Sequence, residues 1–387
     1  MALRIALLTY ATKPRGSVIH TLELAQALQE LGHELCVFAL DKDNQGFHRP
    51  TPFATCPVPA APCSQGIDRL IQQRITEFVT FFQRHLPRYD IYHAQDCLSA
   101  NALAILKHQG RIPHFVRTVH HIEDFQSPYL QACQEKSIHQ PDRCLCVSRL
   151  WQQALAKDYG IQAHRVINGV SRRFSPRPDG SEAALAETYG IHGGPIYLTV
   201  GGIEPRKNSI NLLQAFHQVK RQQPQAQLVI AGGATLFDYR TYRQAFMEQL
   251  AAYELADSLV LPGVVPDAQL PALYRLADGF VFPSVQEGWG LVVLEAIATG
   301  LPVLTSAQAP FTEFLSPQDA ILTDPQDVDA IAAGMVALSN PTTAQALVNH
   351  SRPIIDRYSW RQSAAMHLTL YTQLAGASGV RHPQNEI

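Results

Sequence analysis

Two carboxylates, Glu287 and Glu295, lie eight positions apart in the segment VFPSVQEGWGLVVLEAIATGLPVL, residues 281–304. This segment begins as a short apolar strand, breaks, and resumes as a helix near Leu291 after two glycines. A glycine-containing loop that runs into a helix presents unpaired backbone N–H groups and the positive end of the helix dipole, which together suit a phosphate group. We therefore predict an anion site at this helix start, and the two glutamates must serve another purpose.

A second set of charged residues follows the predicted strand at 196–200. The segment GGIEPRKN turns the chain at Gly201 and Gly202 and then places Arg206 and Lys207 side by side. Arginine offers a planar bidentate fork and lysine a compact point charge, and this pair suits a diphosphate. A solvated charge pair on the surface is the alternative interpretation, since lysine and arginine are mostly exposed.

Three further positions could take part in chemistry. Gly16, in the loop KPRGSVIH, could bring the backbone close to a phosphate, although a helix start alone would also explain it. His120 ends the strand VRTVHH, where an imidazole could donate to a sugar hydroxyl or serve as a hydrogen-bonded structural histidine. Asp41 and Asp43 have the Asp-x-Asp spacing of some metal-dependent sugar-nucleotide enzymes, but isolated charge clusters are mostly solvated loops.

Composition narrows the class of protein. The 387 residues exceed the roughly 100–200 of an ordinary domain, so we expect two domains. With 46% hydrophobic residues, 17% charged residues and a net charge of -2, no nucleic-acid partner is expected. No apolar run reaches the ~20 residues of a membrane span and no signal peptide is evident, so we expect a cytoplasmic protein. The seven cysteines include no CxxC pair, which favours reduced thiols over disulfides or zinc.

The elements that must position these residues alternate between strands and helices, twice over. Predicted strands lie at 4–9, 34–40, 91–93, 115–119 and 143–147, and again at 196–200, 228–231, 258–261, 279–282, 302–305 and 320–323. The polar stretch VINGVSRRFSPRPDGS between the two sets resembles a linker. This predicts an α/β chain of two doubly wound Rossmann-like domains, residues 1–175 and 176–355. Because ligands bind outside the carboxyl ends of such strands, we expect the site in a cleft between the domains.

Two stretches of the first half interrupt the alternation. Residues 50–66 carry five prolines and are predicted to be a loop rather than an element. The helix predicted at 67–86 is strongly amphipathic, with apolar residues on one face and arginines beside it. That face is expected to pack on the sheet, and weak association with a membrane surface through the first domain is the alternative.

These motifs resemble those of a known family. The segment EGWGLVVLE is similar to the E-x7-E motif of retaining GT-B glycosyltransferases of family 4. Other segments resemble the family in the same order along nearly the whole chain: PRGSVIHTLELAQAL, HAQDCLSANAL, TVHH, CVSR, VINGVSRRFSP, GGIEPRKNSINLLQAF, VIAGG, LPGVV and ADGFVFPSVQEGWG. The resemblance also implies that a C-terminal helix at about 356–375 packs back on the first domain.

The resemblance implies a role for each candidate. Arg206 and Lys207 would hold the donor diphosphate and stabilise it as the leaving group. Glu287 would contact the donor sugar, and Glu295 would bind the ribose hydroxyls. The remaining donor-binding positions would be Gly16, Gly201, Val264, Gly288, Trp289, Gly290 and Leu291.

His120 would lie by the C6 side of the sugar. Two positions differ from the family pattern. Trp289 stands where the family often has phenylalanine, as a similar aromatic in the sugar pocket, and Ser17 stands where a second glycine is more usual.

The function implied is transfer of a sugar from a nucleotide diphosphate sugar to a hydroxyl acceptor, with retained configuration and without a metal or other cofactor. A sugar-nucleotide epimerase or hydrolase of the same fold is the first alternative. A catalytically inactive sugar-nucleotide-binding protein is the second. The sequence names neither the donor sugar nor the acceptor, and it gives no oligomeric state.

Overall fold

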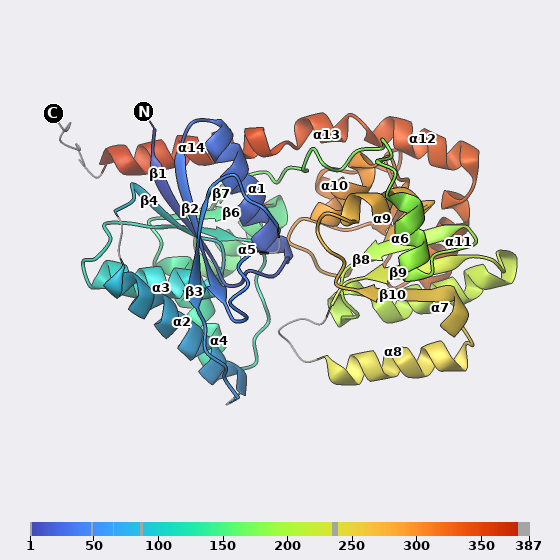
Figure 1. The fold of residues 1–387 in the computed structure, drawn as a ribbon, viewed down its shortest axis with the longest axis horizontal. Helices are drawn as coiled ribbons and strands as arrows, with labels where there is room; N and C mark the ends of the chain where they lie inside the picture. Colours follow the sequence, from blue (N-terminus) through green and yellow to red (C-terminus); the bar gives the residue numbers. More distant parts are fainter. Residues whose placement is uncertain (1, 48, 65, 86–87, 234–238, 378–387) are drawn as a thin grey trace. The chain divides into compact units, whose positions relative to one another are not determined.

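A computed structural model of the chain describes residues 2–47, 49–64, 66–85, 88–233 and 239–377 (Figure 1). It divides into two compact units, one formed by Met1–Gly169 with Ser359–Ile387 and the other by Val170–Tyr358. Both units are built on a parallel sheet. Among the described residues, no helix combines the length and the apolar character that crossing a membrane would need.

The first unit contains a seven-stranded sheet with strand order β3-β2-β1-β4-β5-β6-β7, as far as the described residues go. All its pairings are parallel. Its strands are β1 (Arg4–Thr9), β2 (Glu34–Asp41), β3 (Ala54–Pro59), β4 (Ile91–Ala94), β5 (Val116–Val119), β6 (Arg143–Cys146) and β7 (His164–Arg165). The order reverses direction between β1 and β4, the switch point of a doubly wound fold.

Helices cover this sheet and complete its core. They are α1 (Gly16–Glu30), α2 (Gly66–Arg84), α3 (Cys97–His108), α4 (Pro128–His139), α5 (Arg149–Tyr159) and α14 (Trp360–Ala377). The last of these, drawn in red in Figure 1, belongs to the first unit and packs against α1. The central strand β1 is buried along almost its whole length, because a parallel sheet covered on both faces needs a near-continuous apolar run.

The apolar face of α2 packs in the core, as the sequence indicated. Ile75, Phe78, Val79 and Phe82 are buried in the main hydrophobic cluster of the first unit. The predicted last residue of this helix, Leu86, lies outside the described residues.

The prediction of a loop at residues 50–66 was wrong in part. Residues Ala54–Pro59 form β3, which pairs in parallel with β2 at the edge of the sheet. Proline cannot donate to a ladder of hydrogen bonds, and within sheets it is tolerated mainly on edge strands. Pro57 and Pro59 therefore fit this strand only because β3 has a single neighbour.

The second unit repeats the same arrangement. Its described residues form a six-stranded parallel sheet in the order β10-β9-β8-β11-β12-β13. The strands are β8 (Ile196–Val200), β9 (Gln227–Ala231), β10 (Leu259–Gly263), β11 (Gly279–Phe282), β12 (Val303–Ser306) and β13 (Ile321–Thr323). The helices are α6 (Glu182–Tyr189), α7 (Ser209–Gln222), α8 (Arg240–Ala252), α9 (Leu270–Leu276), α10 (Leu291–Ala298), α11 (Val328–Leu338), α12 (Pro341–Ser351) and α13 (Ile354–Arg357). Its core joins α7 and α11 to the sheet.

Gly169 closes the first segment of the first unit and has no room for a side chain. A Cβ there would overlap the backbone nitrogen of Trp360 and would lie 2.8 Å from its Cα. We predict that Gly169→Ala lowers the free energy of unfolding by roughly 1–3 kcal/mol, because an added methyl group in such a site forces the backbone apart. Urea denaturation measures the change.

Gly376→Ala is the matched control for this prediction. Gly376 lies in α14, and a Cβ there would meet no heavy atom within 4 Å. Alanine is favoured over glycine inside a helix, so this variant should keep or slightly raise the stability. Equal stability of the two variants would contradict the close approach at Gly169.

Candidate active site

The two charged segments singled out in the sequence meet in the second unit. Strands β8 and β11 are parallel neighbours, so their carboxyl ends lie at the same edge of the sheet. The chain leaves β8 through Gly201 into a short 3-10 helix, Pro205–Lys207. It leaves β11 into the loop that contains Glu287 and then enters α10. Strand order thus brings residues about 80 positions apart into contact.

Three charged side chains meet at one carboxylate oxygen. Lys207 Nζ lies 2.5 Å from Glu287 Oε1, and Arg206 Nη1 lies 3.1 Å from the same atom. The Nε of Arg206 also lies 3.1 Å from Glu204 Oε2. Ser284 Oγ lies 2.9 Å from Glu287 Oε1 and 2.7 Å from the carbonyl oxygen of Arg206, which ties the loop after β11 to the segment after β8.

Burial makes these charges depend on one another. Glu287 is only 9% exposed, and the side chains of Lys207 and Arg206 are 13% and 37% exposed. Burial alone would raise the pKa of the Glu287 carboxyl, but the charges of Lys207 and Arg206 and the bonds from Lys207 and Ser284 outweigh it, so this pKa falls below its usual value. Glu287 is therefore ionised at neutral pH, and Arg206 is the most solvent-accessible charge of the three.

The ends of β8 and β9 are in direct backbone contact. A Cβ on Gly232 would overlap the carbonyl group of Gly201, and a Cβ on Gly202 would lie 2.8 Å from Glu204 Oε1. A Cβ on Gly233 would overlap the side chain of Val264. Gly232 and Gly233 were not predicted as site residues, although the segment VIAGG was the sequence signal for them.

Val264 is unusually exposed for a valine. It follows β10 and is 63% exposed, while Val265 beside it is buried. Gly233 brings this side chain next to the glycines that follow β8. The structure thus places Val264 and Gly201 at the same edge of the sheet.

The loop before α10 has the backbone geometry of a helix start. Gly290 has a φ of +99°, a left-handed conformation that favours glycine, and a Cβ there would lie 2.6 Å from the Phe311 ring. Leu291 is the first residue of α10. The backbone amides from Gly288 to Leu291 therefore lie at the N-terminus of α10, as the sequence predicted.

Trp289 differs from its predicted role. Its side chain is only 3% exposed and stacks on Phe314 with ring centroids 4.8 Å apart, while Tyr358 lies 5.2 Å away. The indole is thus part of a buried aromatic cluster rather than the open wall of a sugar pocket.

Glu295 has a different partner from Glu287. It is 9% exposed on α10, and the phenol of Tyr274 donates a hydrogen bond of 2.8 Å to its Oε2. Tyr274 lies on α9 and was not recognised from the sequence. The two glutamates of the segment therefore have opposite surroundings, cations for Glu287 and a phenol for Glu295.

The remaining candidates lie in the first unit. Gly16 is the first residue of α1, and a Cβ there would meet open space. His120 Nε2 lies 3.2 Å from Gln95 Oε1, and its ring is 4.6 Å from the buried ring of His20. Burial, followed by the neighbouring His20 and Arg117, holds the pKa of His120 well below its usual value, so this imidazole is neutral at physiological pH.

Asp41 is not the solvated residue that the sequence suggested. Its side chain is buried at the end of β2, and its Oδ2 accepts the backbone N–H of Gly46 at 2.7 Å. Asp43 instead pairs with Lys13 at 2.7 Å. Across the part of the chain that the structure describes, no group of three or more His, Cys, Asp or Glu residues is arranged to hold a metal ion.

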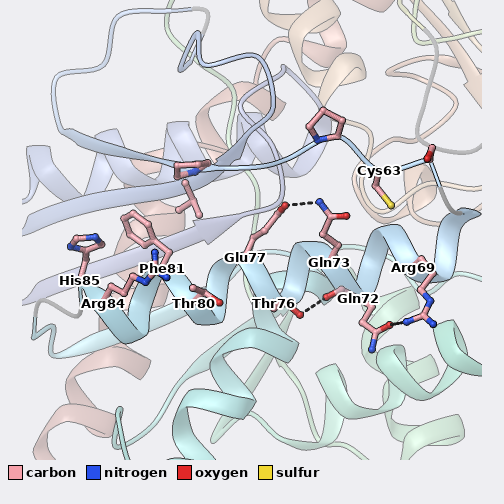
Figure 2. Close-up of a pocket in the computed structure, with 14 residues that line it drawn as sticks. Cys63, Arg69, Gln72, Gln73, Thr76, Glu77, Thr80, Phe81, Arg84 and His85 are labelled. Carbon is pink, nitrogen blue, oxygen red and sulfur yellow. Dashed lines mark hydrogen bonds between the residues drawn. The ribbon is translucent and has the colours of Figure 1, made fainter.

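A pocket of about 720 Å³ lies elsewhere in the first unit, between α2 and the segment around Pro59 and Pro62 (Figure 2). Polar side chains of α2 line it, among them Arg69, Thr76 and Arg84. Several of them bond to one another, for example Gln73 to Glu77 at 2.8 Å, as Figure 2 shows. None of the predicted donor-binding residues lines this pocket.

The fold and these motifs define a glycosyltransferase of the GT-B class. Sucrose-phosphate synthase from Thermosynechococcus elongatus has the same fold, with a TM-score of 0.78 at 22% identity over 97% of this chain and 100% of that one. Residues 14–173 match the model of Glycosyltransferase Family 4, and residues 183–352 match that of Glycosyl transferases group 1. The chain belongs to family 4 of the glycosyltransferases and is a glycosyltransferase enzyme.

Two relatives of known activity are similar over much of the chain. O-antigen chain mannosyltransferase B from Escherichia coli is 26% identical over 278 residues, which are 68% of this chain and 71% of the relative. A GDP-mannose-dependent alpha-(1-6)-phosphatidylinositol monomannoside mannosyltransferase from Mycolicibacterium smegmatis is 30% identical over 233 residues, which are 57% of this chain and 59% of the relative.

Replacement of Glu287 by glutamine tests the charge cluster. A buried charge that loses its partner costs about 3–5 kcal/mol, so Glu287→Gln should lower the free energy of unfolding by that order at pH 7. The folded pKa of Glu287 lies below the unfolded one, so its ionised form stabilises the protein above the ordinary glutamate pKa, and this stabilisation is lost as the pH falls through the folded pKa. The difference between wild type and variant should therefore stay nearly constant from pH 7 to about pH 5, and should shrink when urea denaturation is carried below the ordinary glutamate pKa of 4.5.

Glu248→Gln is the control for this pH series. Glu248 is exposed on α8 and accepts a bond from Gln244 at 2.9 Å. Surface substitutions of this kind change stability by about 0.5 kcal/mol or less. A difference for Glu287→Gln that stays constant even below the ordinary glutamate pKa would contradict the ionised state of Glu287.

Proposed function

We propose that this glycosyltransferase moves a sugar from a nucleotide diphosphate sugar to a hydroxyl acceptor, with retention of configuration and without a metal ion. The observation that carries the proposal is the buried contact of Arg206 and Lys207 with Glu287 at the carboxyl ends of β8 and β11. Two adjacent cations beside a helix start suit a diphosphate. A relative named as GDP-mannose-dependent supports a nucleotide sugar as the donor.

Arg206 and Lys207 bind the diphosphate in this proposal. Without a donor their charges are balanced by Glu287, so a diphosphate competes with that carboxylate for the same cations. The guanidinium of Arg206 is the more exposed of the two and can meet the diphosphate first. Glu287, released in part from its cations, can then accept hydrogen bonds from the hydroxyls of the donor sugar.

The other donor contacts follow from position along the same edge. The backbone amides from Gly288 to Leu291 face the phosphate and sugar oxygens, and Gly201 allows the backbone to approach closely. Glu295 binds the ribose hydroxyls, and the exposed Val264 lies where the base is expected. In the first unit, Gly16 for the diphosphate and the neutral imidazole of His120 for the C6 side of the sugar are candidates that rest on the resemblance to the family.

In this mechanism the protein stabilises the charge on the leaving group and positions the donor and the acceptor. The bond between the anomeric carbon and the phosphate oxygen breaks, and the acceptor oxygen forms its bond on the same face. The departing phosphate takes the acceptor proton, so no strong protein base is required. Arg206 and Lys207 stabilise the negative charge that grows on the leaving diphosphate.

Two other functions use the same donor site. A sugar-nucleotide epimerase or hydrolase would form product without any acceptor. A catalytically inactive sugar-nucleotide-binding protein would bind the donor and turn over none. The complete set of cations and carboxylates favours catalysis, because an inactive binding protein would need to keep only the groups that bind the donor.

A panel of UDP-, GDP- and ADP-sugars tests the donor assignment. One of them should support transfer or hydrolysis, and Lys207→Ala should lower its turnover by about 10²–10³, the usual effect of removing one electrostatic contact to the transition state. Glu287→Ala should also lower it at least tenfold. Arg221→Ala and Glu248→Ala, at exposed positions of α7 and α8, are the controls and should keep full activity. Full activity in both site variants would overturn the site.

Stereochemistry and metal dependence are tested on the same reaction. Nuclear magnetic resonance of the first product should show the anomeric configuration of the donor. Incubation with EDTA should leave the rate unchanged, since Arg206 and Lys207 supply the positive charge that a metal would otherwise provide. An inverted product, or a rate that EDTA abolishes and Mg²⁺ restores, would contradict the mechanism.

A further inference from the structure

We propose that Tyr274 is a positioning residue that holds the Glu295 carboxylate in the orientation needed to bind the ribose of the donor. This inference rests on the proposed role of Glu295. It begins from the hydrogen bond of 2.8 Å between the Tyr274 phenol and Glu295 Oε2, which joins α9 to α10. The same phenol lies 3.2 Å from the carbonyl oxygen of Val292, one turn before Glu295 on α10.

The phenol has one hydrogen to donate, and the Glu295 carboxylate accepts this hydrogen bond. A bond to an ionised acceptor is shorter and stronger than a bond to a neutral carbonyl, in line with the distances of 2.8 Å and 3.2 Å. Burial, reinforced by the charge of Glu295, keeps the pKa of Tyr274 well above its usual value, so the phenol stays protonated. Glu295 Oε2 is thereby fixed, which restricts rotation of the carboxylate about its last bond.

The ring of Tyr274 is itself held in place. It is fully buried, with Phe280 of β11 on one side and Phe174 edge-on to it, both at ring centroid distances of 5.5 Å. Because interiors are close-packed, such a ring has a single position.

Phe174 lies in the segment before α6, and the preceding residue, Arg173, fixes its position. The guanidinium carbon of Arg173 lies 4.7 Å from the Phe174 ring centroid. The same guanidinium donates to the backbone oxygen and to Oδ1 of the buried Asp267, each at 2.7 Å. A continuous set of contacts therefore runs from Asp267 through Arg173 and Phe174 to Tyr274 and ends on Glu295.

Such an arrangement matters for hydroxyl recognition. A carboxylate that binds two vicinal hydroxyls must present its oxygens at a fixed angle. Without the hydrogen bond from Tyr274, the Glu295 carboxylate can rotate away from that angle. Loss of the Tyr274 phenol should then weaken binding of the ribose hydroxyls in particular. A purely structural role of Tyr274 would instead weaken all ligands of the site alike.

Calorimetric titration with UDP, GDP and ADP, each beside its 2′-deoxy and 3′-deoxy forms, separates these cases. For the diphosphate that binds best, the wild-type protein should prefer the ribonucleotide over a deoxy form by about tenfold or more, because a hydrogen bond to a charged group is lost. Tyr274→Phe should reduce this preference at least threefold, and Glu295→Gln should reduce it by at least as much.

Tyr197→Phe is the matched control. Tyr197 is also fully buried in the second unit, and its phenol bonds to Gln223 and to the Met335 carbonyl group, at 2.7 Å and 2.8 Å. It should lose stability as Tyr274→Phe does and keep the preference for ribose. If Tyr274→Phe does not fold, Phe174→Leu, which keeps the phenol but loosens its ring, should show a smaller reduction of the preference.

The outcomes separate this inference from the function on which it rests. An unchanged preference in Tyr274→Phe or its substitute, together with a reduced one in Glu295→Gln, overturns the role of Tyr274 alone. An unchanged preference in Glu295→Gln overturns the ribose contact and the inference with it. Failure of the wild-type protein to bind any of the three diphosphates overturns both.

Discussion

The balance of charge around Glu287 is the constraint on which the rest of the second unit depends. A carboxylate that is 9% exposed would be costly to bury alone, and a lysine beside it would be equally costly. Each is tolerated because the other is present, with Arg206 and Ser284 as additional partners. The cluster requires β8 and β11 to be adjacent and parallel, because only then do the segments that follow them leave the sheet at the same edge.

In the proposed function, the same cluster explains how a stable resting state can be ready for a charged donor. Lys207 and Arg206 are held in position by Glu287 before any ligand arrives, so little side-chain entropy remains to be lost on binding. Glycines at the ends of β8 and β9 keep the backbone close to this point, since side chains there would overlap neighbouring backbone atoms. Under the proposed mechanism, this preorganised positive charge stabilises the leaving group.

Three differences from the sequence-based expectations have physical causes that local patterns do not contain. β3 is a strand in spite of its prolines, because an edge strand needs only one set of bonds. Asp41 is buried because the Gly46 amide satisfies its carboxylate. Trp289 belongs to the aromatic cluster with Phe314 and Tyr358, which comes together only when segments distant in sequence meet.

The sequence by itself determined the alternation of strands and helices, the two parallel sheets and the family, because periodicity and short motifs are local properties of the chain. It also singled out Arg206, Lys207, Glu287 and Glu295 by residue type and spacing. Only the tertiary structure decided that the two cations share one oxygen of Glu287, and that Glu295 instead takes a bond from Tyr274. Contacts of this kind depend on strand order and on the packing of α9 against its neighbours, and no pattern within a short segment encodes them.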